Sequence, residues 1–157
     1  MKRMTVLIAA LFALSAPLAS LAMDHEGHDH GSMGHGDHKV NVTHEEVVDG
    51  IKATIIIQTM AESMKAMGME MPMGVKETHH VHVEFKDVKS GKALTEGEVK
   101  VKVQGPDKAE KTKELMGMQG HFGADFNLST KGKYGVMTRF QLKDGKVRNV
   151  KFWYTVK

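Results

Sequence analysis

The sequence predicts an all-β fold, an antiparallel β-sandwich of the immunoglobulin-like type with about seven strands, over residues 39–157. The first observation is a series of short runs in which apolar and polar residues alternate, which is typical of half-buried strands. Turn signals such as Asp49-Gly50 and Asp144-Gly145 separate these runs, and such dipeptides favour tight hairpins. A helical spacing of apolar residues extends over a turn or two at most. Together these features indicate a sandwich with very little helix.

The first 22 residues have the pattern of an export signal. Lys2 and Arg3 precede a short apolar run over 6–14, Pro17 follows, and residues 20–22 form a small-x-small cleavage pattern. The run is too short to span a membrane, and a chain without cysteine has no residue for a lipid anchor. We therefore expect a periplasmic or secreted protein of residues 23–157 that folds without disulfides.

Residues 23–38 form a tail rich in histidine, glycine and aspartate. Its low apolar content cannot offset the entropy of ordering, so we expect it to be disordered. His-rich tracts bind metal ions, although a solubilising leader would have a similar composition. The histidines of the tail are His25, His28, His30, His35 and His38. Cleavage after Ala22 would also make His25 the third residue, where its imidazole, the terminal amine and two backbone amides suit copper(II) or nickel(II) in a plane.

The domain is predicted to begin with two strands and a methionine-rich loop. Residues 40–44 alternate and residues 51–59 are rich in β-branched side chains, with Asp49-Gly50 between them. Residues 60–74 break this rhythm with Gly68, Pro72 and Gly74, which argue against a long helix, so we predict a flexible, partly turned loop. The loop carries six thioethers, on Met60, Met64, Met67, Met69, Met71 and Met73.

The strand predicted over 78–85 is the clearest in the chain. Its alternation places His79 on one face with Val81 and Phe85, and His80 and His82 on the other face. Further strands are predicted over 99–104, 115–128, 134–142 and 148–156, with a charged loop over 105–114. In the run 115–128, Met116 and Met118 share a period of two with Phe122, so core packing is their expected role. Either thioether is also a candidate for a third ligand beside His80 and His82.

Histidine and methionine in this arrangement predict a metal site. His80 and His82 lie about 7 Å apart at Cα on one face of a strand, and two such imidazoles can converge on one ion. We expect thioether donors from Met67, Met69, Met71 and Met73, because the loop is tethered to this strand. His121 and His79 are further candidates, although His79 is equally well explained as a core histidine. Imidazole with thioether matches copper, as copper(I), copper(II) or both.

Other functions are less well supported by the composition. Zinc or nickel would suit the imidazoles alone, and the Met-rich loop would also suit a structural or assembly module that docks a partner. Without Lys2 and Arg3 the chain has 20 basic and 19 acidic residues, and it lacks a basic face with interleaved aromatics, so nucleic acid is not expected as a partner. Nucleophile sets, phosphate loops and paired catalytic carboxylates are not visible. We therefore expect no enzymatic activity.

Two resemblances accompany this prediction. The run His80-Val81-His82-Val83-Glu84-Phe85 is loosely similar to the His-x-His strand of copper-zinc superoxide dismutases, but the further ligands and the disulfide of that family are missing. The export signal, the His-rich leader, the Met-rich loop, the strand over 78–87 and the ending over 146–157 resemble the YtkA-like (FixH-related) periplasmic domains. In style, the chain also resembles copper-resistance carriers of the CopC kind. These resemblances imply a β-sandwich that handles copper, as a carrier or buffer that passes the ion to a periplasmic or membrane-bound partner.

Overall fold

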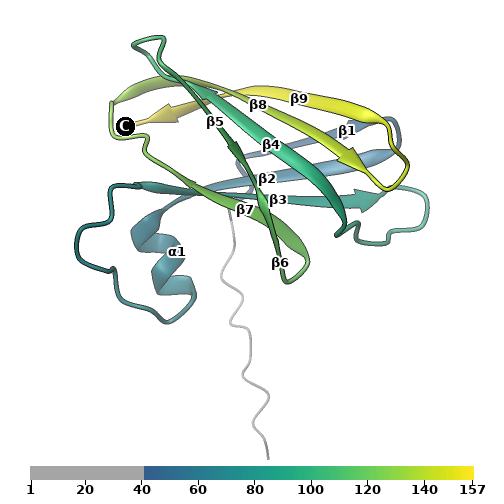
Figure 1. Ribbon diagram of the computed structural model, residues 1–157, viewed down its shortest axis with the longest axis horizontal. Helices are drawn as coiled ribbons and strands as arrows, with labels where there is room; N and C mark the ends of the chain where they lie inside the picture. Colours follow the sequence, from purple (N-terminus) through teal and green to yellow (C-terminus); the bar gives the residue numbers. More distant parts are fainter. Residues whose placement is uncertain (1–40) are drawn as a thin grey trace, which may run out of the picture. The chain divides into compact units, whose positions relative to one another are not determined.

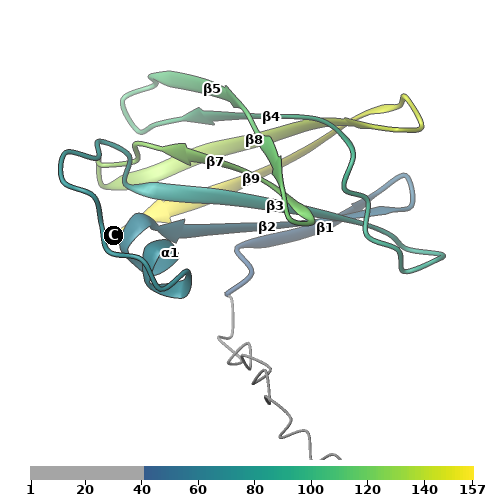
Figure 2. The ribbon, with the colours of Figure 1, turned by 60° about the horizontal axis from the view of Figure 1, so that its bottom comes forward.

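The computed structural model describes residues 41–157, which form two antiparallel sheets packed face to face (Figures 1 and 2). The five-stranded sheet has the order β1-β2-β3-β7-β6, and the four-stranded sheet has the order β5-β4-β8-β9. The bounds are β1 His44–Val48, β2 Ile51–Thr59, α1 Met60–Ala66, β3 His79–Asp87, β4 Gly97–Gln104, β5 Glu110–Glu114, β6 Met116–Met118, β7 His121–Phe126, β8 Gly132–Leu142 and β9 Val147–Val156. The predicted antiparallel sandwich is confirmed, with nine strands in the described part of the chain.

The hydrophobic core fills the space between the two sheets. Alternate residues of β2, β3, β4, β8 and β9 point inward, as their period of two predicts. The largest fully buried side chains are those of Phe126, Phe140, Ile55, Leu128, Val81, Val83, Val99, Val101, Val136, Val150 and Thr138. On the edge of this core, the His44 ring of β1 stacks on the Phe152 ring of β9, with the centroids 4.5 Å apart.

The first hairpin has the predicted turn but a different first strand. Asp49 and Gly50 have φ values of 48° and 75°, as a two-residue turn between twisted strands requires. This turn sets the register, because it pairs Val48 with Ile51 and His44 with Ile55. The strand therefore covers His44–Val48, and its prediction over 40–44 was wrong.

The run 115–128 is a hairpin where a single strand was predicted. Gln119 and Gly120, with φ values of 24° and 92°, reverse the chain between β6 and β7. Across a two-residue turn the alternation shifts, so Met118 is paired with His121 and Gly117 with Phe122. The prediction that Met116 and Met118 pack in the core was wrong, because they are 70% and 41% exposed.

The segment 60–74 begins with a short helix, which the loop prediction missed. Thr59 caps α1 in a capping box: its side chain accepts from the Glu62 backbone N–H, and the Glu62 carboxylate accepts from the Thr59 backbone N–H. Met60 and Ser63 are the buried residues of the helix. The residues that disfavour a helix lie after these seven residues: Gly68 has a φ of 66°, and Pro72 lies in the irregular segment that follows.

The charged segment 105–114 also contains a strand that composition did not predict. Residues of β5 are all exposed, and they pair with β4 as the edge of the four-stranded sheet. A charged edge strand needs no apolar face, because backbone pairing holds it and its charges oppose further pairing. Lys102 Nζ of β4 donates to Glu110 Oε2 across this pair at 2.9 Å.

The predicted signal segment 1–22 and the tail 23–38 with its five histidines lie outside the described residues. Among residues 41–157, no helix has the length and apolar character needed to cross a membrane.

Candidate metal site

The candidate site lies on the outer face of the five-stranded sheet, away from the core. His80 and His82 of β3 alternate with the fully buried Val81 and Val83, so both imidazoles point outward. His121 is the first residue of β7, the strand that pairs with β3. Its ring comes to the same face because the next residue, Phe122, is paired with the inward-pointing Val83, so His121 points outward.

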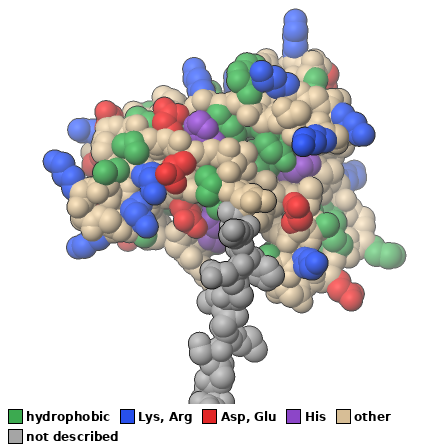
Figure 3. Space-filling view, turned by 180° about the vertical axis from the view of Figure 1, so that it is seen from behind, with side chains coloured by type: hydrophobic (Ala, Val, Ile, Leu, Met, Phe, Trp, Pro, Cys, Tyr) green, Lys and Arg blue, Asp and Glu red, His purple; other side chains and the backbone are tan. Residues whose placement is uncertain are grey.

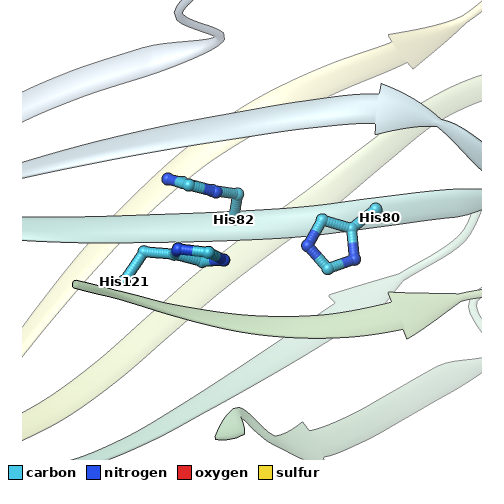
Figure 4. Close-up of side chains that lie close together, drawn as sticks. All are labelled: His80, His82 and His121. Carbon is cyan, nitrogen blue, oxygen red and sulfur yellow. The ribbon is translucent and has the colours of Figure 1, made fainter. Parts of the chain in front are cut away.

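These three histidines form a cluster that could hold one metal ion. One ring nitrogen of each of His80, His82 and His121 lies within 4.8 Å of the other two. Figure 4 shows the His82 and His121 rings side by side, with the His80 ring next along β3. The His82 and His121 rings are stacked, with centroids 3.9 Å apart and planes 13° from parallel. The β3–β7 pairing thus brings His82 and His121, 39 positions apart in the sequence, into contact.

Two carboxylates orient the rings of β3. His80 Nδ1 donates to Asp125 Oδ1 at 2.6 Å, and His82 Nε2 donates to Glu84 Oε1 at 2.7 Å. Each bond occupies one ring nitrogen and leaves the lone pair of the other one free, Nε2 on His80 and Nδ1 on His82. Such carboxylate–histidine pairs are usual around bound metals, because they set the tautomer and raise the basicity of the ligating nitrogen.

The surroundings of His121 favour its neutral form. Partial burial lowers the pKa of His121 from 6.5, and the neighbouring His82 and His80 rings lower it further, while Glu84 opposes the shift. A metal ion binds the neutral imidazole. This ligand is therefore ready for an ion at a more acidic pH than an isolated histidine.

A glycine makes room for the His80 ring. A Cβ atom on Gly123 would stand 2.9 Å from His80 Cε1 and 3.0 Å from His80 Nε2, closer than side-chain atoms pack. The same point lies 3.6 Å from Met118 Sδ. Gly123 is paired with His82 on one side and with Met116 on the other. Directly paired residues share a face, so Met116 and Met118 lie on the face that carries the imidazoles.

Of the predicted ligands in the described part of the chain, His80, His82 and His121 come together, whereas His79 does not join them. His79 is buried on the opposite face of β3, where its Nδ1 is hydrogen-bonded to Thr78 Oγ1 at 2.8 Å and its ring meets the Tyr154 ring edge-on at 5.9 Å. Burial lowers the pKa of His79 from 6.5, and the charge of Glu62 opposes this shift. His79 also lines a cavity of about 710 Å³ beside α1. Its role as a core histidine is the one that this position favours.

The predicted thioethers of the loop lie on the exposed segment that follows α1. Met67, Met69, Met71 and Met73 are 55%, 51%, 45% and 101% exposed. Their side chains are thus open to solvent or to a partner.

The donor set suits a borderline or soft metal. Three imidazoles favour copper, zinc or nickel, and nearby thioethers favour copper, whereas calcium and magnesium take oxygen ligands. The surface in Figure 3 carries histidine side chains, hydrophobic side chains and charges of both signs intermixed.

Sequence reasoning missed three residues of this site. They are Asp125, Glu84 and Gly123, and the places of Asp125 and Gly123 beside His80 became visible only with the register of β3 and β7. A weak signal exists for Glu84, since it lies two residues after His82 and so shares its face. For Asp125 and Gly123 the signal would have been the strand pairing itself, which local pattern does not determine.

No protein-family model matches the chain, and no curated protein matches it in sequence. Solved structures do share its fold. FetP from the uropathogenic Escherichia coli strain F11, expressed in the periplasm of E. coli, has a TM-score of 0.56 at 12% identity, and the match covers 73% of this chain and 93% of FetP. A copper-bound variant of FetP gives 0.56 at 13% identity, over 71% of this chain and 93% of FetP. A DUF4426 family protein from Pseudomonas aeruginosa PAO1 gives 0.54 at 12% identity, over 72% of this chain and 96% of that protein. At this identity the likeness shows the fold alone.

Proposed function

We propose that this protein binds copper at His80, His82 and His121 and acts outside the cytoplasm as a metal carrier or buffer. The observation that carries the proposal is the cluster of three imidazole nitrogens within 4.8 Å of one another. The hydrogen bond from His80 to Asp125 supports the proposal, because it fixes the orientation and tautomer of the His80 imidazole, as is usual for a metal ligand. The copper-bound structure of FetP shows that a protein of this fold holds copper.

A carrier role agrees with the exposure of the site. The side chains of His80 and His82 are 16% and 21% exposed, so an ion there would be held but still within reach of a partner's ligands. The five histidines of the tail would capture ions and raise their concentration near the folded site. Copper, as copper(I) or copper(II), is the cargo in this proposal, and the protein catalyses no reaction. A periplasmic location and a transfer partner belong to the same proposal.

Copper titration of two variants tests the function. The first replaces the five tail histidines with asparagine, which leaves the folded site as the main one. The second also carries His80→Ala and His82→Ala. We expect the first variant to bind one copper ion per chain in competition with a chromophoric chelator, and the second to lose this binding while its far-ultraviolet circular dichroism is unchanged. A first variant that binds no copper would refute the carrier proposal.

Zinc or nickel is the nearest alternative cargo, because three imidazoles suit both. Parallel titrations with zinc(II) and nickel(II) decide between the metals. A site that binds zinc and ignores both copper ions would make the protein a zinc carrier or buffer.

The exposed thioethers support a second candidate function, a module that docks a partner protein. Met67, Met69, Met71 and Met73 are all exposed apolar side chains of one short segment, and exposed apolar surface often marks interaction sites. Replacing all four with serine should abolish partner binding and leave copper binding intact if docking is their role. A loss of copper binding would instead make them ligands.

A further inference from the structure

We infer that Met118 and Met116, on the short edge strand β6, are the thioether donors of the copper site and give it an affinity for copper(I). This inference rests on the proposed function and assigns its soft ligands. It also means that the four methionines of the 67–73 segment are not ligands of this site.

The position of the Met118 sulfur is the first argument. Met118 Sδ and His80 Nε2 lie 3.6 Å and 3.0 Å from one point above Gly123, where any other residue would place its Cβ. The nitrogen is the one that the bond from His80 Nδ1 to Asp125 leaves free. A soft sulfur and a free imidazole lone pair thus meet over a vacant side-chain position. This is the donor combination that copper(I) prefers.

The strand register gives the second argument. Met116, Gly123 and His82 form one row across β6, β7 and β3, and Met118 is paired with His121 in the next row. Neighbouring strands are about 4.8 Å apart, so Met116 and His82 stand roughly 10 Å apart at Cα with only a glycine between them. Two long side chains leaning over that glycine can meet an ion from opposite sides.

The exposure of the two methionines gives the third argument. Methionine usually packs in cores, but Met116 and Met118 are 70% and 41% exposed on a three-residue strand. The inward residue of β6 is Gly117, which is paired with Phe122 of the core. The strand therefore contributes little to the core, and its two long side chains both face the histidine cluster.

The test compares copper(I) binding in four chains that all carry the tail histidines as asparagine. They are the parent, Met116→Leu/Met118→Leu, the matched control Met67→Leu/Met69→Leu, and the variant with leucine at 67, 69, 71 and 73. Leucine keeps the apolar volume and removes the sulfur. Copper(I) is supplied without oxygen against a chromophoric chelator, and zinc(II) affinity is measured in parallel.

We expect Met116→Leu/Met118→Leu to lose roughly tenfold or more in copper(I) affinity, since even changes in the outer shell of a site cost 10–100-fold. Its zinc(II) affinity should stay that of the parent, because the imidazoles remain. X-ray absorption of the copper(I) form should show a sulfur neighbour in the parent and in both loop variants, and none in Met116→Leu/Met118→Leu.

Three outcomes overturn the inference. The first is an unchanged copper(I) affinity in Met116→Leu/Met118→Leu, and the second is a parent without a sulfur neighbour. The third is a loss of copper(I) affinity in the variants of the 67–73 segment instead. A parent that binds neither copper(I) nor copper(II) is a different failure, because it removes the proposed function itself.

Discussion

At the scale of single residues, the vacant position above Gly123 controls the His80 ring. A methyl group there would meet His80 Cε1 at 2.9 Å, and the ring cannot swing away freely because Asp125 holds its Nδ1. We expect Gly123→Ala to lower copper affinity about tenfold, as displaced ligands do, and to change the free energy of unfolding by less than about 1 kcal/mol.

Gly117→Ala is the matched control for Gly123→Ala on the neighbouring strand. Its added Cβ would meet only Phe122 Cε1, at the ordinary distance of 3.9 Å. Copper titration and urea unfolding of both variants check the prediction. Equal copper affinities in the two variants would contradict the prediction, because they would show that the His80 ring can move aside without loss of copper binding.

Asp125 is a positioning residue for His80. Asp125→Asn keeps the shape of the side chain but removes the charge that accepts from His80 Nδ1, so the imidazole becomes less basic and its tautomer is no longer set. We expect copper affinity to fall 10–100-fold, the usual effect of losing such a partner. Glu114→Gln, on the exposed strand β5, serves as the control in the same titration. An Asp125→Asn variant with the affinity of this control would contradict the role.

At the scale of elements, α1 depends on its cap. The helix has seven residues, too few to be stable alone, and the reciprocal bonds between Thr59 and Glu62 satisfy two of its free N–H groups. We expect Thr59→Ala to lower the free energy of unfolding by about 1 kcal/mol, measured by urea unfolding. Thr59→Ser keeps the accepting oxygen and should stay close to the parent. Copper affinity should be the same in all three chains, since α1 contributes no ligand to the proposed site.

The same scale shows what the sequence could predict of the fold and the site. Alternation predicted β3, β4, β8 and β9, because each has one buried face and the period of two reports burial directly. β2 was predicted from its β-branched side chains instead, and three consecutive isoleucines in it are buried. It failed for β5, whose residues are all exposed, and for β6, whose pairing with β7 inverts the expected faces. His80 and His82 were predicted from one strand. Their convergence with His121, and the places of Asp125 and Met118, depend on the pairing of β3 with β7 and β6, which no local pattern encodes.

At the scale of the whole molecule, buried His79 links folding to pH. Burial lowers its pKa from 6.5 in the folded chain, so between that lowered value and about 6.5 the unfolded chain binds more protons. Stability should therefore be greatest above pH 6.5 and fall as the pH drops below it. Urea midpoints from pH 7.5 to 5 measure the effect.

His79→Gln should flatten this pH dependence, although its stability at pH 7.5 will be lower than that of the parent. His121→Gln should flatten it as well, because the pKa of His121 is also lowered. Only His121→Gln should weaken copper binding. If the urea midpoint of His79→Gln depended on pH as steeply as that of the parent, the His79 imidazole would be solvated in the folded chain.

The site and the core lie on opposite faces of the same sheet. Val81 and Val83 point to the interior while His80 and His82 point away from it. Binding or release of a metal ion at the histidines therefore requires no movement of the packed core side chains. A partner protein could coordinate the ion with its own ligands while these histidines are still bound to it. The ion would then pass from this protein to the partner through a shared intermediate, without being released into water. An open sheet face permits that kind of hand-over, whereas a closed interior cage would have to unfold first.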